Sequence, residues 1–274
     1  MEAFRAISSS PGDAMTEVQL SADGFLAEAD RIVRTADARG IALRICGSVG
    51  IFRSVRDDPL AVRLYGLRNG TSPSKIAFKD LDLAALERDA SRVYRLFVRE
   101  MQFQEDRETN ALFGSFRNIY YHPQFQIDVF FDVLRFNHAI PIKDRLVGGV
   151  TLPLEDIFLG KVQIHSPPRK DFLDLAAFAA AVPFSRLDRG YLEDFFGNDW
   201  GLWYDADMNL KATRTTIEAL RSGGEISEAD AKSVLGRLDE YRTFLETCPK
   251  SRRWERRAAK GTKDLWYEPV DEVR

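Results

Sequence analysis

Two aspartates interrupt an apolar segment of this 274-residue chain, and their spacing is a candidate chemical signal. They are Asp80 and Asp82 in "FKDLDLAAL". Side chains alternate across a strand, so both carboxylates are expected on one face, opposite Leu81 and Leu83. Two like charges this close would have raised pKa values unless a cation compensates them, and a divalent metal such as magnesium would do so. An edge strand with solvated aspartates is the alternative, because Asp-x-Asp alone is a weak pattern.

Two further features would complete a site around these carboxylates. Gly47-Ser48 follows a β-rich run and precedes an apolar segment, which predicts a strand, a tight turn and a short helix. Backbone N–H groups, a hydroxyl and a helix N-terminus favour phosphate at such a turn. Asp128 lies in the second strand of a hairpin predicted around "HPQ". If that strand lies beside the first, three carboxylates could hold two metal ions about 4 Å apart.

A lysine on the apolar side of a predicted helix is a third candidate. Lys161 lies in "LEDIFLGKVQIHS", which Pro167-Pro168 separates from a second helix containing Asp171 and Asp174. A buried ammonium needs an anionic partner, either triphosphate oxygens or one of these two carboxylates. The alternative is a lysine whose stem packs while its head reaches water. Asp171 could instead complement the helix dipole, and Arg169 could be a surface residue.

The order of these elements resembles the nucleotidyltransferase fold of the DNA polymerase β superfamily. That order is a strand, Gly-Ser and a helix, then a strand with Asp-x-Asp, then a strand with one Asp. The segment "LEDIFLGKVQIHSPPRKDFLDLAAF" is similar to the closing motifs of AbiEii-like nucleotidyltransferases, which include type IV toxin–antitoxin proteins. The likeness covers roughly residues 20–180. It departs in the long segment between Ser48 and Asp80 and in the single glycine before the serine.

The resemblance implies Mg²⁺-dependent transfer of a nucleoside monophosphate from an NTP to a macromolecular acceptor. The acceptor would be an RNA or tRNA end or a protein, and the chain a toxin–antitoxin or phage-defence component with a cognate toxin or antitoxin. Small-molecule acceptors also occur among relatives. The alternative is a catalytically inactive nucleotide-binding or antitoxin-like partner-binding module, although retention of three strand carboxylates counts against it. An α/β domain with fortuitous acids is a third reading.

The resemblance also implies a role for each candidate residue. Two Mg²⁺ ions would be bound by Asp80, Asp82 and Asp128, the last as third carboxylate or base. The nucleotide would be bound by Gly47, Ser48, Lys161 and Arg169. The catalytic set would be Asp80, Asp82, Asp128, Lys161, Asp171 and Asp174.

The expected fold is α/β of the α+β kind, a nucleotidyltransferase-like mixed sheet flanked by helices. We expect a domain over residues 1–180 and a mostly helical C-terminal region over 181–274. Residues 53–79 are polar and turn-rich, which favours an insertion or irregular connection. Residues 87–112 show helical spacing of apolar residues, which predicts one long surface helix.

Composition narrows the class of protein. A net charge of −3 argues against a generally basic nucleic-acid coat protein. No stretch approaches the roughly 18 uninterrupted apolar residues of a membrane helix, and the start of the chain lacks a signal-peptide pattern. We therefore expect a soluble cytoplasmic protein with no membrane partner. Cys46 and Cys248 make neither a disulfide framework nor a metal cluster, and Cys46 is expected in the core.

A basic and aromatic tail spans residues 248–267. Residues 248–263 contain seven Lys or Arg and one Glu, with Trp254 among them and Trp266-Tyr267 close behind. Basic residues interleaved with aromatics could bind the phosphates and stack on the bases of an RNA acceptor. The alternative is a solvated helix end whose aromatic residues dock on the domain.

Overall fold

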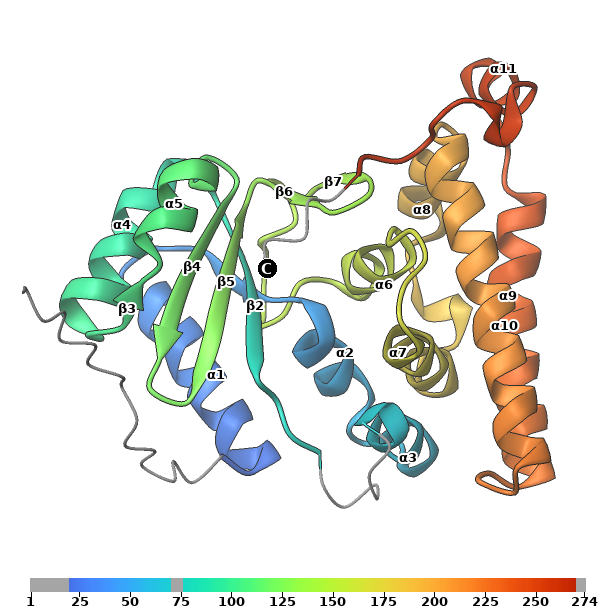
Figure 1. Cartoon of the computed structure of the whole chain (residues 1–274), viewed down its shortest axis with the longest axis horizontal. Coiled ribbons are helices and arrows are strands. Elements are labelled where there is room, and N and C mark those ends of the chain that lie inside the picture. Colours follow the sequence, from blue (N-terminus) through green and yellow to red (C-terminus); the bar gives the residue numbers. More distant parts are fainter. Residues whose placement is uncertain (1–19, 70–75, 270–274) are drawn as a thin grey trace, which may run out of the picture.

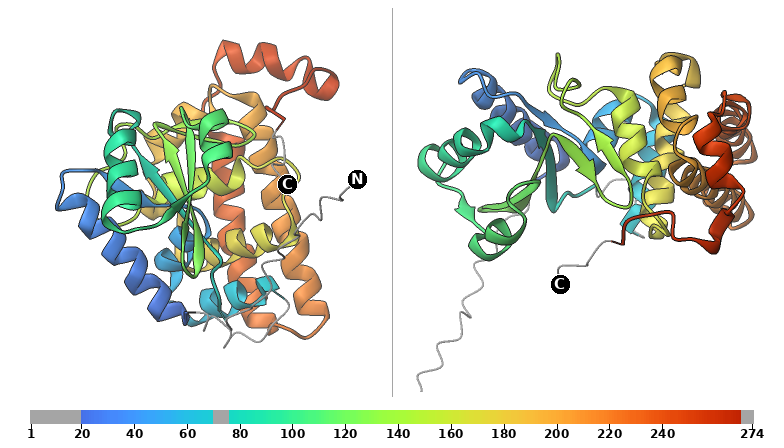
Figure 2. Two further views of the ribbon diagram at one scale, coloured as in Figure 1. Left: turned by 60° about the vertical axis from the view of Figure 1, so that its left-hand side comes forward. Right: turned by 90° about the horizontal axis from the view of Figure 1, so that it is seen from above.

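The computed structural model describes residues 20–69 and 76–269 and confirms a mixed α+β fold. A five-stranded sheet lies at one end of the molecule and long C-terminal helices at the other, with shorter helices between them (Figure 1). Figure 2 shows the same arrangement from two other directions. Among the described residues, no helix combines the length and apolar character that a bilayer-spanning segment needs.

The large sheet has the strand order β1-β2-β5-β4-β3. Only β2 and β5 run parallel; the other neighbours are antiparallel. The bounds are β1 Leu43–Ile45, β2 Asp80–Ala85, β3 Gln104–Glu105, β4 Arg117–His122 and β5 Phe125–Phe131. A small second sheet pairs β6 Val133–Arg135 with β7 Ala139–Pro141. The hairpin predicted around "HPQ" is confirmed by β4 and β5, which pair up to His122 and Phe125.

Helix α1 (Ala22–Asp37) covers one face of the sheet. The Ser21 hydroxyl caps it by accepting from the Gly24 N–H at 3.1 Å. Its apolar stripe is buried throughout: Phe25, Leu26, Ala29, Ile32, Val33 and Ala36. The Phe25 ring lies 4.5 Å from that of Phe125, whose side of β5 also carries Ile127 and Val129. The opposite face of β2 and β5 is thereby left for the polar residues.

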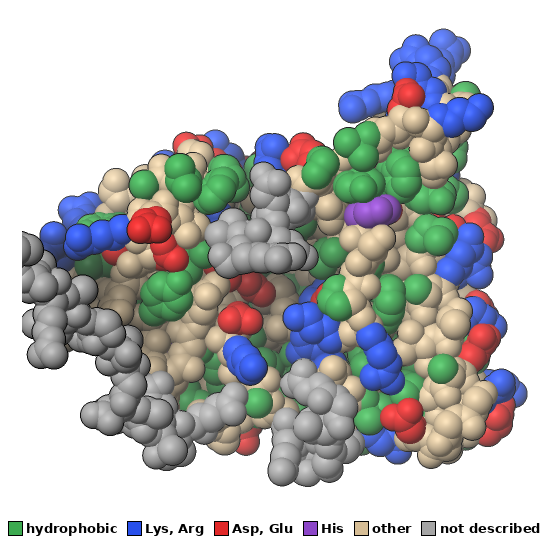
Figure 3. All heavy atoms as spheres, viewed as in Figure 1, with side chains coloured by type: hydrophobic (Ala, Val, Ile, Leu, Met, Phe, Trp, Pro, Cys, Tyr) green, Lys and Arg blue, Asp and Glu red, His purple; other side chains and the backbone are tan. Residues whose placement is uncertain are grey.

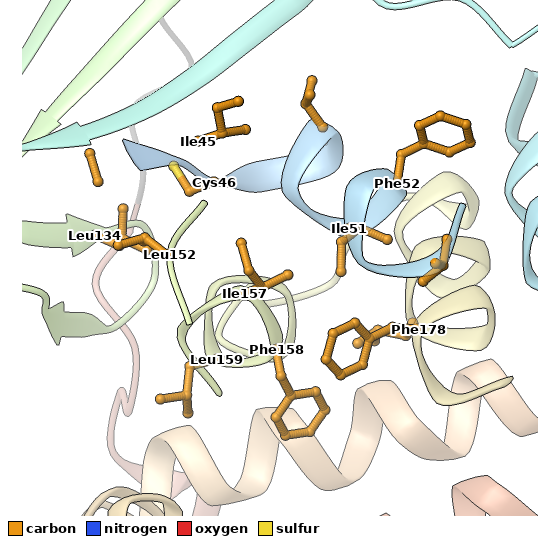
Figure 4. Close-up of a cluster of buried hydrophobic side chains, with 14 of the residues drawn as sticks. Ile45, Cys46, Ile51, Phe52, Leu134, Leu152, Ile157, Phe158, Leu159 and Phe178 are labelled. Carbon is orange, nitrogen blue, oxygen red and sulfur yellow. The ribbon is translucent and has the colours of Figure 1, made fainter. Parts of the chain in front are cut away.

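Three helices pack beside that polar face: α2 (Gly47–Val55), α6 (Leu154–Val162) and α7 (Arg169–Ala181). Figure 4 shows Ile157 of α6 directed toward α2, while Phe158 lies beside Phe178 of α7. A β-carbon at Gly50 would lie 2.5 Å from Ile157 Cδ1, so the glycine permits a close approach of α2 and α6. Cys46 is buried in this core, as predicted.

The C-terminal part is helical, as expected. Its elements are η4 Phe184–Arg186, α8 Arg189–Phe196, α9 Trp200–Ser222, α10 Glu228–Thr247, α11 Arg252–Ala258 and η5 Gly261–Lys263. Helices α9 and α10 pack against α7 and form the outer wall of the molecule (Figure 1). The aromatic cluster at the start of α9 is packing, since Trp200 and Leu202 are buried.

The prediction of an irregular connection over residues 53–79 was wrong for most of the described part. Helix α3 (Pro59–Gly66) and the short η1 (Leu67–Asn69) occupy it, while residues 70–75 lie outside the described residues. The Asp58 carboxylate accepts from the Ala61 N–H at 2.9 Å, and Pro59 occupies the first turn. Leu64 and Tyr65 are buried on the side of α3 that packs against α7. An aspartate cap followed by proline is a helix-start signal.

The single long helix predicted over residues 87–112 was also wrong. The segment divides into η2 Glu87–Asp89, α4 Ala90–Tyr94, the π-helical η3 Arg95–Glu100, β3 and α5 Arg107–Phe113. Gln102 has a left-handed φ of 59°, which ends the helix and lets β3 pair with β4. Phe97 and Phe103, on either side of this bend, pack with ring centroids 5.5 Å apart. Both rings are buried against β4, and this packing stabilises the bend in place of a continuous helix.

Candidate active site

The parallel register of β2 and β5 places the predicted carboxylates side by side. Asp80 is the partner of Gln126, and Asp82 is the partner of Asp128. Paired residues of adjacent strands point to the same face, so all four polar side chains share it. Asp128 is buried, Asp82 is partly buried and Asp80 is exposed at the open end of the strand. The sequence prediction that Asp80 and Asp82 share a face is confirmed, and the condition left open for Asp128, a strand adjacent to theirs, is met.

Gly47 brings the start of α2 against Asp82. The Cys46 N–H donates to the Asp82 carbonyl at 2.9 Å, which continues the pairing of β1 with β2. Gly47 has a φ of +57°, and a β-carbon there would lie 1.9 Å from Asp82 Oδ2. No side-chain hydrogen bond caps α2, and the first residue of this helix lies against the carboxylate. Glycine is therefore needed here for two reasons, backbone conformation and space.

The electrostatic surroundings of Asp82 disfavour its charge. Burial raises the pKa of this carboxyl to about 6, and the negative charge of Asp128 acts in the same direction. The cation of Lys161 opposes both effects. The pKa of Asp80 is also raised, by desolvation and by Asp128, against the opposing charges of Lys170 and Lys79. A nearby cation would therefore stabilise the charged form of both aspartates.

Asp128 has its own cation. Arg117 of β4 donates to Asp128 Oδ1 from Nη2 at 2.9 Å and from Nε at 3.2 Å. The Gln126 side chain donates to Oδ2 at 3.1 Å. Both carboxylate oxygens are therefore engaged, and the described residues contain no group of three His, Cys, Asp or Glu side chains arranged to hold a metal ion. Asp80 and Asp82 fit Mg²⁺, which proteins commonly bind through one or two carboxylates together with substrate phosphates.

Lys161 lies in a second, buried charge cluster. Its ammonium is 2.6 Å from Asp171 Oδ1 and 2.7 Å from Asp174 Oδ2. All three residues are buried. Burial alone would lower the pKa of Lys161, but the two carboxylates outweigh it and raise the value, so the ammonium stays charged. The carboxylate partners predicted for Lys161 are thus confirmed.

Arg68 joins this cluster to the start of α2. Its Nε lies 2.7 Å from Asp174 Oδ1, an ion pair whose alignment falls short of hydrogen-bond geometry. Its guanidinium also donates to the Tyr65 hydroxyl at 2.6 Å. That hydroxyl donates to the Ser48 carbonyl at 3.1 Å. Residues of α3 and η1 therefore connect α7 to the Gly-Ser turn.

A cavity of about 450 Å³ opens beside Asp80. It is lined by Ser48, Arg68, Ala77, Phe78, Lys79, Asp80 and Lys170. Figure 3 shows acidic and basic side chains together in the hollow between the sheet and the helices. A hydroxyl, three cations and a carboxylate converge there, which is the chemistry expected of a polyphosphate site.

The structure separates the predicted residues into three groups. Gly47, Ser48, Asp80, Asp82 and Asp128 form one continuous site. A second group, the cluster of Lys161, Asp171 and Asp174, lies close enough for the Lys161 charge to act on Asp82. Arg169 is exposed at the start of α7 and does not line the cavity; its neighbour Lys170 does.

Sequence reasoning missed four cations of this region: Arg68, Lys79, Arg117 and Lys170. Lys79 and Lys170 adjoin recognised motifs, and that adjacency was the available signal. Arg117 could have been found from the hairpin register, which places it diagonally opposite Asp128. Arg68 could have been predicted only if helix α3 had been recognised.

Comparison with known proteins adds no family to this description. No protein-family model matches the chain, and a search of curated proteins found no match. The resemblance to nucleotidyltransferases therefore stays a prediction from the motifs.

The space at Gly47 can be tested by Gly47→Ala. We expect a loss of about 2–5 kcal/mol in the free energy of unfolding, because left-handed strain and the collision with Asp82 add. Gly224→Ala is the matched control: Gly224 has a φ of +75° and open space around it, so only the backbone cost of about 1–2 kcal/mol applies. Denaturant unfolding measures both. Equal losses in the two variants would contradict the close approach.

The buried charge cluster can be tested by Lys161→Met. We expect about 3–5 kcal/mol of destabilisation, because two buried carboxylates lose a shared cation. Lys211→Met is the control, since it removes an exposed lysine from an i,i+4 pair with Asp207 and should cost less than about 1 kcal/mol. If the Lys161→Met protein were as stable as this control, the charge cluster would contribute little to the free energy of unfolding.

The raised pKa of Asp82 predicts that the stability of the folded state depends on pH. Because the folded-state pKa is about 6 against an ordinary 3.8, the folded state binds the extra proton between these values. This carboxyl's contribution to stability is present below about pH 4 and is lost as pH rises through 6. We expect its ¹³C carboxyl resonance, assigned by its loss in Asp82→Asn, to titrate near pH 6. A midpoint near 4 would contradict the desolvated pair.

Proposed function

We propose that this chain is a Mg²⁺-dependent nucleotidyltransferase that moves a nucleoside monophosphate from an NTP to a macromolecular acceptor. One observation carries the proposal. Within the described residues, Asp128, Asp171 and Asp174 each have a salt bridge to Lys or Arg, whereas Asp80 and Asp82 have none. Asp80 lines the cavity that contains three cations, and Asp82 lies against Gly47, whose neighbour Ser48 also lines the cavity.

The cavity would bind the polyphosphate. Ser48 and the uncapped start of α2 offer hydrogen-bond donors, and Arg68, Lys79 and Lys170 offer positive charge. Arg68 is held in place by Asp174 and the Tyr65 hydroxyl, so it is already oriented before a nucleotide arrives. Lys79 and Lys170 are exposed and could close on the phosphates afterwards. These side chains would stabilise the negative charge that builds up on the leaving pyrophosphate.

Asp80 and Asp82 would hold Mg²⁺, which when bound supplies charge neutralisation and activation of the acceptor hydroxyl. Asp128 would orient the site through Arg117 and Gln126, or serve as the third ligand if Arg117 moves aside. Lys161 would offset part of the negative charge of Asp82, because its charge already lowers the pKa of that carboxyl.

Label transfer tests this function. The purified protein would be incubated with Mg²⁺, each α-³²P-labelled NTP in turn, and total RNA or total protein as acceptor. We expect one acceptor class to become labelled, and Asp80→Ala and Asp82→Ala to reduce transfer about a hundredfold or more, because the groups that bind the metal are lost. Asp57→Ala removes an exposed carboxylate whose side chain is 99% accessible, and should transfer label like the parent.

Two outcomes would contradict the proposal. Label absent from every acceptor, despite measurable NTP binding, would favour the inactive nucleotide-binding module. Equal transfer by the parent and Asp82→Ala would place the chemistry elsewhere.

A further inference from the structure

Positive charge is concentrated at one end of the chain. Residues 248–263 carry a net charge of +6, from seven Lys or Arg and one Glu, so the rest of the chain carries −9. Figure 3 shows Lys and Arg side chains gathered over α11, which stands out from the body of the molecule. A local basic surface on an acidic protein is a feature that the average charge conceals.

The aromatic residues of this segment pack inward. The Trp254 ring lies 5.2 Å from that of Trp203, with the Lys250 ammonium over both rings. Trp266 donates to Asp205 at 3.1 Å, and Tyr267 stacks on His165 at 3.8 Å. The expectation that these rings stack on RNA bases is therefore replaced by its alternative, docking on the domain.

The same contacts fix α11 as a rigid platform. The Ser251 N–H donates to the Gly197 carbonyl at 2.9 Å, and the Ser251 hydroxyl caps the helix. Arg257 is used internally: its guanidinium lies over Trp200 and donates to the Gly261 and Asp264 carbonyls. The helix is therefore anchored at both ends.

Three arginines are left facing water. Arg252, Arg253 and Arg256 are exposed, and within the described residues none of them forms a salt bridge. Their i, i+1, i+4 spacing places them on one side of the helix. The backbone of α11 is already anchored, so binding would have to order only the arginine side chains. Guanidiniums without a salt bridge favour an anionic ligand.

We propose that α11 is a docking surface for a nucleic-acid strand, which it binds through backbone phosphates without reading its bases. An arginine guanidinium can donate two parallel hydrogen bonds to the oxygens of one phosphate. Contacts to phosphates fix the position of a strand but carry no sequence information. Protein interfaces are anchored mainly by buried Trp, Tyr and Arg side chains, and Trp254 and Tyr267 of this segment are already packed into the fold. That the strand is the acceptor for transfer rests on the proposed function; the binding itself does not.

Fluorescence anisotropy tests the surface without NTP or metal. The probes would be two labelled RNAs of equal length and unrelated sequence, and a DNA of the first sequence, measured across a salt series. We expect the two RNAs to bind the full chain within about threefold of each other, because phosphates are shared by all sequences. The RNA and DNA arms distinguish which kind of strand is preferred.

The test variant is the triple Arg252→Gln, Arg253→Gln, Arg256→Gln. We expect affinity at low salt to fall about tenfold or more, and the slope of log K against log salt to fall by about 2, because three phosphate contacts are lost. The control triple, Arg34→Gln, Arg88→Gln and Arg99→Gln, removes the same charge from exposed positions elsewhere and should bind like the parent. Asp82→Asn should also bind normally, which separates this surface from the catalytic proposal.

Three results would overturn the inference. They are no anisotropy change with any probe, equal loss of affinity in both triples, or displacement of RNA by polyglutamate as effectively as by unlabelled RNA. The last result would identify an acidic polypeptide as the partner instead.

Discussion

The close approach of Asp82 to the start of α2 is the constraint on which the candidate site depends. The two meet because β1 pairs with β2 up to Cys46 and the chain then turns directly into the helix. Only a residue without a β-carbon leaves room for the carboxylate at that turn. The same turn sets the direction of the uncapped helix end, and Ser48 consequently lines the cavity.

Apolar packing between helices positions the second charge cluster relative to the start of α2. Gly50 lets α2 lie close to Ile157 of α6, and α6 carries Lys161 one turn further on. Helix α7, packed against both α2 and α3, brings Asp171 and Asp174 to the lysine. The distance between Lys161 and Asp82 is therefore set by helix packing, and the lysine influences the carboxylate through its charge.

The sequence predicted those parts of the site that depend on local periodicity. Strand alternation put Asp80 and Asp82 on one face, and the hairpin around "HPQ" was identified. The parallel register of Asp82 with Asp128 depends on pairing between strands far apart in sequence, which local patterns leave open. Arg117 follows instead from the antiparallel register of the β4–β5 hairpin, which places it diagonally opposite Asp128. Arg68 was missed for a different reason: its helix starts with Asp58-Pro59 inside a stretch whose polar composition favoured a loop.

The balance of charge supports the proposal that the site binds a cation. Two pairings are internal: Lys161 and Arg68 offset Asp171 and Asp174, and Arg117 offsets Asp128. Asp80 and Asp82 then remain without a salt bridge among the described residues, and the pKa of each is raised, first by desolvation and then by the negative charge of Asp128. At low pH, protonation of one carboxyl would remove the repulsion between the two carboxylates. Near neutrality a divalent ion, bound as proposed, would compensate both carboxylates without protonation, and the cations that line the cavity would then face the phosphates of the proposed nucleotide.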